Sequence, residues 1–191
     1  MPLGRGRIQG VKGSPLLPPG SSTTFVADAE HYTRVLELTT RAESMLWLGT
    51  ADLKDLHVAQ PRGQRPYLSM IAELIDRGVE VRLIHAKEPG PRFRADFDRY
   101  PNLAARLERV LCPRVHFKLI IIDSRICYIG SANLTGAGMG MKSPHRRNFE
   151  AGVLTTEPAL LSAAMEEFDR VWRGEGCTRC GHKRTCPDPL C

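Results

Sequence analysis

The feature that most constrains this chain is a short apolar run at residues 119–122, Leu-Ile-Ile-Ile. Side chains alternate along a strand, so a run that is apolar at every position must be buried on both faces. Asp123-Ser124-Arg125 interrupts the run, and a second apolar segment at 126–129 ends in small residues that favour a turn. The pattern predicts a hairpin of two core strands.

Polar side chains stand at regular places around this hairpin. His116 and Lys118 precede the apolar run and share one strand face by the period of two, while Asp123 follows the run. Ser131 and Asn133 come directly after the return strand, whose turn brings them back towards His116. We therefore expect an imidazole, an amine and small hydrogen-bonding groups at the lip of a core strand.

This spacing, with His-x-Lys, four residues, Asp, six residues and Gly-Ser-x-Asn, resembles the HKD motif of the phospholipase D superfamily at every position. The resemblance implies an α/β fold, a phospholipase D-like α-β-α sandwich with a central mixed sheet, over residues 25–173. It also implies that Glu150, on the next predicted strand, is an acidic member of the site.

A histidine suits phosphodiester cleavage because its ordinary pKa lies near neutrality, so it can act as nucleophile and as acid. The resemblance implies that one histidine forms a phosphohistidine and that a second, from another motif, protonates the leaving oxygen. The chain holds one motif, so we expect a homodimer that shares its active site. Lys118 is expected to clamp the phosphate, Asn133 and Ser131 to hydrogen-bond it or orient a neighbour, and Glu150 to fix the His116 tautomer.

Asp123 is expected to be structural, because its place in the hairpin lets it accept nearby donors. One carboxylate, a lysine and an amide around a histidine suit a metal-independent mechanism, so no cofactor is expected for catalysis. Lys142, Arg146 and Arg147 follow a glycine-rich stretch and link two segments of the site. We expect them to bind substrate phosphates; the alternative is a solvated run of charge.

The composition indicates which classes of partner the chain can bind. With 191 residues, 42% of them hydrophobic, the chain can bury a core of its own, and its formal net charge of +6 favours a polyanion. We find no apolar stretch near the roughly 20 residues of a membrane helix and no secretory signal in residues 1–24. The expectation is a cytoplasmic protein without a membrane partner.

The chain divides into a flexible basic arm (1–24), a catalytic domain (25–173) and a Cys/His-rich tail (174–191). In the catalytic domain the patterns predict helices at 29–43, capped by Asp28, and at 66–77, 96–110 and 158–173. They predict strands at 45–48, 79–84 and 149–155, a loop at 50–64 and irregular structure at 136–140.

The tail concentrates metal-ligand residues in a short segment, namely Cys177, Cys180, His182, Cys186 and Cys191. A Cys-x-x-Cys pair followed by further soft ligands predicts a structural zinc site, formed by the four cysteines or with His182 replacing one of them. An iron–sulfur cluster and a disordered reactive tail are the alternatives. Cys112 and Cys127 are expected to be small core residues.

These features together predict a dimeric, metal-independent endonuclease of DNA or RNA. One alternative is a phospholipid phosphodiesterase or transferase, which the single motif and the lack of a membrane-docking segment disfavour. Another is a nucleic-acid-binding module that has kept the fold without turnover, which the intact motif disfavours.

Overall fold

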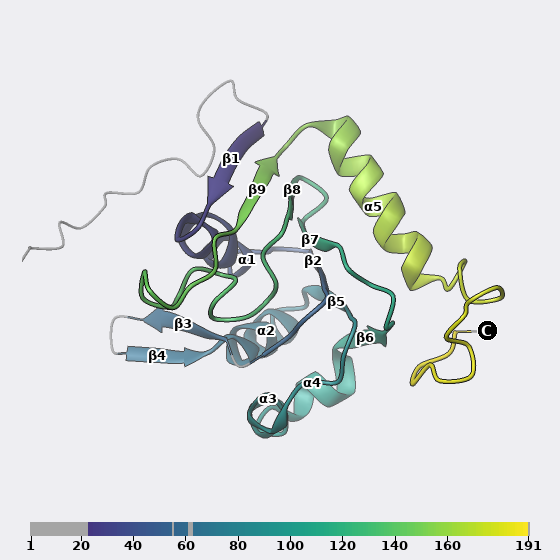
Figure 1. Cartoon of the computed structure of the whole chain (residues 1–191). Coiled ribbons are helices and arrows are strands. Elements are labelled where there is room, and N and C mark those ends of the chain that lie inside the picture. Colours follow the sequence, from purple (N-terminus) through teal and green to yellow (C-terminus); the bar gives the residue numbers. More distant parts are fainter. Residues whose placement is uncertain (1–22, 55, 61–62, 191) are drawn as a thin grey trace, which may run out of the picture.

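A seven-stranded mixed sheet forms the centre of the computed structural model, which describes residues 23–54, 56–60 and 63–190 (Figure 1). The strands lie in the order β1-β9-β8-β7-β2-β5-β6, and only the pairs β2-β5 and β5-β6 are parallel. Their bounds are β1 (Thr23–Ala27), β2 (Met45–Thr50), β5 (Glu80–His85), β6 (Glu108–Leu111), β7 (Lys118–Ile122), β8 (Ile126–Gly130) and β9 (Ala151–Thr155). The apolar run thus lies in the middle strand, β7.

Helices cover both faces of this sheet, and each face has its own core. On one face lie η1 (His31–Leu36), α1 (Glu37–Thr39), α2 (Tyr67–Asp76), α3 (Pro91–Phe97) and α4 (Pro101–Arg106); on the other lies α5 (Pro158–Trp172) (Figure 1). Ile120 and Ile122 enter the first core, and Leu119 and Ile121 enter the core under α5. The predicted α-β-α sandwich is confirmed, and β7 is buried on both faces as its sequence requires.

The predicted hairpin is also confirmed. β7 and β8 are antiparallel, with Lys118 opposite Gly130 and Ile122 opposite Ile126. The turn between them holds Asp123 and Ser124 at φ of 53° and 51°. Such left-handed residues give a short turn the twist that matches its two strands. The register therefore places the start of β7 beside the end of β8.

The predicted helix at 29–43 is wrong in its shape and in its cap. The chain forms a π-helical turn, η1, followed by the short α1, which ends at Thr39. Asp28 does not cap it: this residue has a φ of 46°, and its carboxylate accepts the N–H of Glu150 at 3.2 Å. A long-range contact to the segment before β9 thus takes the place of the predicted cap.

Two other segments differ from the sequence prediction. The predicted loop at 50–64 contains most of a second, two-stranded sheet, β3 (His57–Gln60) with β4 (Gly63–Pro66). The predicted helix at 96–110 is divided into the end of α3, α4 and β6, because Pro101 starts a new helix at the position that tolerates a missing N–H. The remaining predicted helices and strands match in type, with small shifts at their ends.

Both ends of the described part of the chain contact the central sheet. Thr23 and Thr24 belong to β1 and not to the predicted arm, whose other residues, 1–22, lie outside the described part of the chain. Residues 174–190 follow α5 as a series of turns, and the Asp188 carboxylate accepts the N–H of Leu111 on the edge strand β6 at 3.0 Å. None of the helices in the described ranges is long and apolar enough to span a membrane.

Candidate active site

His116 and Lys118 lie where the chain enters β7. His116 stands just outside the strand and is exposed, whereas Lys118 is the first residue of the strand and is only 6% exposed. The Lys118 ammonium donates to the carbonyl oxygen of His116 at 2.7 Å and lies 3.4 Å from the imidazole Nδ1. The predicted pair is therefore together, with the imidazole open to solvent and the amine held beside it.

The environment of Lys118 favours a bound anion. Burial lowers the pKa of its amine, and the negative charge of Glu150 acts in the opposite direction. A second anion next to the amine would stabilise its charged form further, because opposite charges in a partly desolvated site interact strongly. A phosphate beside His116 fits this requirement.

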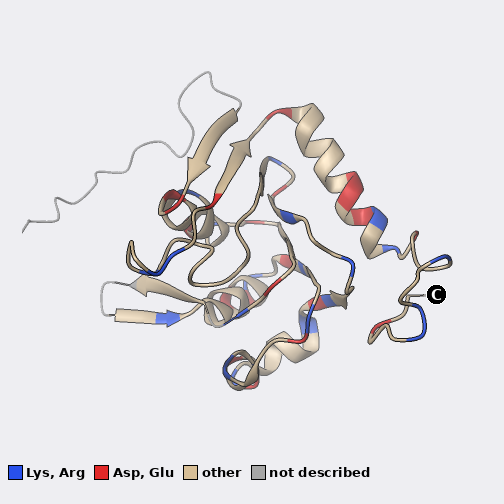
Figure 2. Ribbon diagram, in the orientation of Figure 1, with Lys and Arg blue, Asp and Glu red and all other residues tan. Residues whose placement is uncertain are grey.

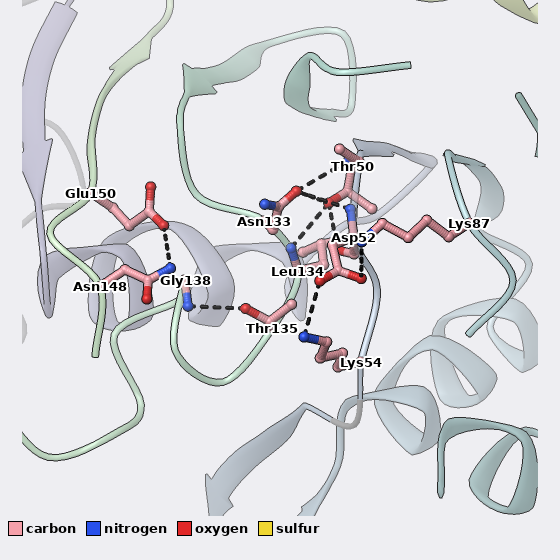
Figure 3. Close-up of polar contacts among 11 residues, drawn as sticks. Thr50, Asp52, Lys54, Lys87, Asn133, Leu134, Thr135, Gly138, Asn148 and Glu150 are labelled. Atoms are coloured by element: carbon pink, nitrogen blue, oxygen red, sulfur yellow. Dashed lines mark hydrogen bonds and ion pairs between the residues drawn. The ribbon is translucent and has the colours of Figure 1, made fainter. Parts of the chain in front are cut away.

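Asn133 is fixed by three donors from the end of β2. Its Oδ1 accepts the N–H groups of Ala51 and Asp52 at 3.2 and 3.0 Å and the hydroxyl of Thr50 at 3.2 Å (Figure 3). The hydroxyl of Thr50 also accepts the N–H of Leu134 at 3.1 Å. All three bonds to the Asn133 side chain use its oxygen, and within the described residues its amide nitrogen has no hydrogen-bond partner, so this nitrogen can donate to a phosphoryl oxygen.

Ser131 and Glu150 form a second polar pair. The Ser131 hydroxyl donates to the Glu150 carboxylate and accepts the N–H of Ala151 at 3.1 Å. The other Glu150 oxygen accepts from the amide of Asn148 at 2.9 Å (Figure 3). Within the described residues Glu150 makes no hydrogen bond to His116, so its expected role in fixing the His116 tautomer stays a prediction.

Tyr128 supports the turn that carries Ser131 and Asn133, a role that the sequence did not reveal. Its buried hydroxyl accepts the N–H of Ala132 at 3.2 Å. The side chain also fills the space beside Gly130 and Gly152, where an added Cβ would collide with the phenol. These two glycines let the phenol lie directly under the motif turn. In the sequence, the only sign of this role is that Gly130 and Gly152 carry no side chain.

Asp123 lies at the opposite end of β7 from His116 and is not part of the cluster. Its carboxylate accepts the N–H groups of Glu43, Ser44 and Met45 and the hydroxyl of Ser44, at 2.8 to 3.1 Å. Burial alone would raise the pKa of Asp123, but these hydrogen bonds outweigh it and hold the pKa below its usual value. Of the motif residues, Asp123 is thus the one that anchors the hairpin turn, as expected from its position.

Two groups of cations lie on segments that adjoin Glu150 and Asn133. Lys142 and Arg146 are exposed and Arg147 is half-buried, and all three lie on the loop before β9, at the edge of the molecule opposite the tail (Figure 2). In the described part of the chain their side chains form no ion pair. Lys54 and Lys87 bind Asp52 at 3.1 and 3.6 Å, next to Asn133 (Figure 3). Both groups add positive charge to the segments that carry Asn133 and Glu150.

The tail, which carries most of the cysteines, follows α5 (Figure 1). Cys177, Cys180, His182 and Cys186 line one hollow, and Cys191 lies outside the described residues. The N–H of His182 and then Arg114 lower the pKa of Cys180. Within ranges 23–54, 56–60 and 63–190, no three ligand-type side chains stand close enough to share one metal ion.

Comparison with known proteins identifies the fold and its family. Residues 36–172 match the family model described as cardiolipin synthase, PLD-like domain. A search of curated protein sequences finds no match.

Three solved structures are similar to the chain at low sequence identity. Nuc from Salmonella typhimurium, a phospholipase D family member, has a TM-score of 0.57 and 20% identity, with 79% of this chain and 93% of Nuc covered. NucT from Helicobacter pylori has a TM-score of 0.58 and 14% identity, with 78% and 94% covered. TrmBL2, an archaeal chromatin protein with a novel mode of DNA binding, has a TM-score of 0.56 and 19% identity, with 81% and 53% covered.

Proposed function

The chain belongs to the phospholipase D superfamily, and from this premise we propose that it is a metal-independent phosphodiesterase that hydrolyses DNA or RNA. The observation that carries the proposal is the pair at the start of β7. An exposed imidazole, His116, stands beside a partly desolvated amine, Lys118, that gains from a neighbouring anion. Catalysis of phosphoryl transfer needs this combination of a nucleophile and fixed positive charge.

The proposed reaction proceeds in two displacements at phosphorus. In the first, an imidazole nitrogen of His116 attacks phosphorus and the bond to the leaving oxygen breaks. The partner's His116, which enters protonated, gives its proton to that oxygen. In the second, the partner's His116 takes a proton from water, the hydroxide oxygen bonds to phosphorus and the phosphorus–nitrogen bond breaks. Each chain supplies one such histidine, which is why we propose a homodimer with a shared site.

The other residues of the cluster hold the phosphoryl oxygens. Lys118 is a point charge next to the reacting imidazole, and Asn133 presents an amide N–H while Thr50 and the backbone hold its oxygen. The Ser131 hydroxyl donates a hydrogen bond to the Glu150 carboxylate, so the position of Glu150 fixes the orientation of Ser131. Because these donors are in place before substrate arrives, they need not reorganise when charge develops on the phosphoryl group.

A nucleic acid is the proposed substrate because two groups of cations adjoin residues of the cluster. Several cations on two separate segments suit a long polyanion better than a single headgroup; they are Lys142, Arg146 and Arg147 before Glu150, and Lys54 and Lys87 beside Asp52. The family model is named for cardiolipin synthase, which supports a phospholipid phosphodiesterase or transferase as the second candidate. TrmBL2, a chromatin protein of similar fold, supports a non-catalytic DNA-binding module as the third.

A cleavage panel separates these candidates. Labelled single- and double-stranded DNA and RNA are incubated with the full chain in EDTA, next to a phospholipid substrate and a His116→Ala control. We expect nucleic-acid cleavage in EDTA that is lost in the variant. Cleavage of phospholipid alone would favour the second candidate, binding without cleavage the third, and strict dependence on Mg²⁺ would contradict the mechanism.

A further inference from the structure

The tail and the loop before β7 enclose one hollow between them. Its walls include three tail cysteines, Cys177, Cys180 and Cys186, and a fourth from the loop, Cys112. Cys112 was expected to be a core residue, and it does contact the core under α5, but it is half-buried and also faces this hollow. Four thiol-bearing residues from two distant segments of the chain therefore line the same space.

The backbone of the tail forms consecutive turns around Cys180. Cys180 donates its N–H to the carbonyl of Cys177 at 3.0 Å, and Lys183 donates to Cys180 at 3.1 Å, so two turns follow each other around Cys180. The sulfur of Cys180 also accepts the backbone N–H of His182. Hydrogen bonds from backbone N–H to sulfur orient and support the ligands of metal sites.

We propose that Cys112, Cys177, Cys180 and Cys186 bind one structural zinc ion between the tail and the catalytic domain. Zinc in structural sites is tetrahedral, and four thiolates at about 2.3 Å satisfy it completely. Because no three of the described ligand side chains yet stand close enough to share an ion, the proposal includes a tightening of the tail onto Cys112 when zinc binds.

The position of Cys112 gives such an ion a role in the fold of the motif segment. Cys112 precedes His116 by a single short loop, in which Arg114 also donates to the carbonyl of Gly176 at 3.5 Å. The Asp188 bond to Leu111 attaches the tail just before this loop. A zinc ion would thus add a third connection between the tail and the loop before β7, at a distance from the substrate.

The decisive measurement is the zinc content of matched single variants of the full chain. Cys112→Ala removes the proposed loop ligand, and Cys127→Ala removes a fully buried cysteine that does not line the hollow. We expect one zinc per chain in the wild type and in Cys127→Ala. In Cys112→Ala, competition with a chelator should show zinc affinity lowered by more than about 100-fold. Loss of a residue that only hydrogen-bonds a metal ligand lowers affinity by at most about 100-fold, so a larger loss indicates a direct ligand.

Alkylation of the unsubstituted protein gives a test that does not depend on how the variants fold. Iodoacetamide and peptide mass mapping should find Cys112 and the three tail cysteines protected with zinc bound, and all four reactive after a chelator removes it. Protection confined to the tail, with zinc lost in Cys191→Ala and kept in Cys112→Ala, would move the fourth ligand to Cys191 and overturn the proposed bridge. Purified protein that holds iron, or takes up no zinc, would overturn the site itself.

Discussion

The two ends of β7 carry residues of the same motif but differ in what holds them. At one end the Asp123 carboxylate accepts three backbone N–H groups and a hydroxyl, so its hydrogen-bonding capacity is used inside the protein. At the other end His116 is exposed, and its described contacts are those with Lys118.

The difference shows that residues of one motif can serve two purposes, stability of the fold and binding of a ligand. A group whose bonds are all satisfied internally contributes to the free energy of folding, whereas a group left open has bonding capacity for a ligand. We therefore expect substitutions at the His116 end to change activity with little effect on stability. Substitutions at the Asp123 end should do the reverse.

The largest expected effect is that of His116→Ala on cleavage. Removal of the nucleophile should lower kcat by about 10⁴-fold or more, since the residual rate would come from binding and electrostatics alone. Because His116 is exposed, Tm should stay close to that of the wild type. Cleavage rates and thermal unfolding of the same preparations check both halves. Retained activity, or a large fall in Tm, would remove the contrast between the two ends.

Asp123→Ala should give the opposite result, with a loss of about 2 kcal/mol in the free energy of unfolding. Asp123→Asn is the matched control, because asparagine tolerates the positive φ and keeps one acceptor oxygen. Denaturant unfolding measures both, and kcat per folded molecule should change little.

The same carboxylate predicts a pH dependence of stability. The pKa of Asp123 in the folded chain lies below its ordinary value of 3.8, so the carboxylate stabilises the fold fully above that value. This contribution is lost as the pH falls through the lowered pKa. The stability difference between wild type and Asp123→Asn should therefore narrow below pH 3.8. A difference that stays constant with pH would assign the effect to turn geometry alone.

Tyr128→Phe tests whether one residue can affect both activity and stability. The hydroxyl is buried and accepts the N–H of Ala132, so its loss should cost about 1 kcal/mol and, by loosening the turn with Asn133, lower kcat by about 10-fold. Tyr32→Phe removes a hydroxyl that also accepts a backbone N–H, from Ala59, away from the motif. That control should lose stability alone. Equal kcat in both variants would show that Tyr128 serves only the fold.

The smallest effect per residue is expected for the cations of the loop before β9. In a His116→Ala background, Lys142→Ala with Arg146→Ala should weaken DNA binding and reduce the salt slope by about two units, one for each phosphate that is no longer neutralised. Lys183→Ala with Arg184→Ala removes two charges at the opposite edge of the molecule (Figure 2). If both double variants change the salt dependence of DNA binding equally, the loop before β9 does not bind DNA more closely than the tail does.

The sequence was sufficient for those parts of the fold and site that local pattern determines. The apolar run of β7, its hairpin with β8 and the amphipathic α5 follow from spacing alone, and the same spacing brings His116 and Lys118 together.

The remainder depends on contacts between residues far apart in the chain. Thr50 meets Asn133 across 83 residues, and Asp28 meets Glu150 across 122, so no local pattern signals either contact. The second of these replaces a helix cap by a long-range bond, which is how tertiary structure overrides helix propensity at 29–43. The tail is the converse case: its ligand pattern is plain in the sequence, whereas Cys112 joins it only through the fold.

The central place of β7 in the sheet also determines the timescale on which the entry to the motif can move. β7 pairs with β2 on one side and β8 on the other, so amide protons such as those of Ile120 and Ile121 should exchange with solvent only when the whole domain unfolds. His116 lies two residues before the first paired position, outside the ladder, and its amide should exchange through small local openings. The segment that carries His116 can thus open locally, while the strand that directly follows it should be among the slowest parts of the molecule to open.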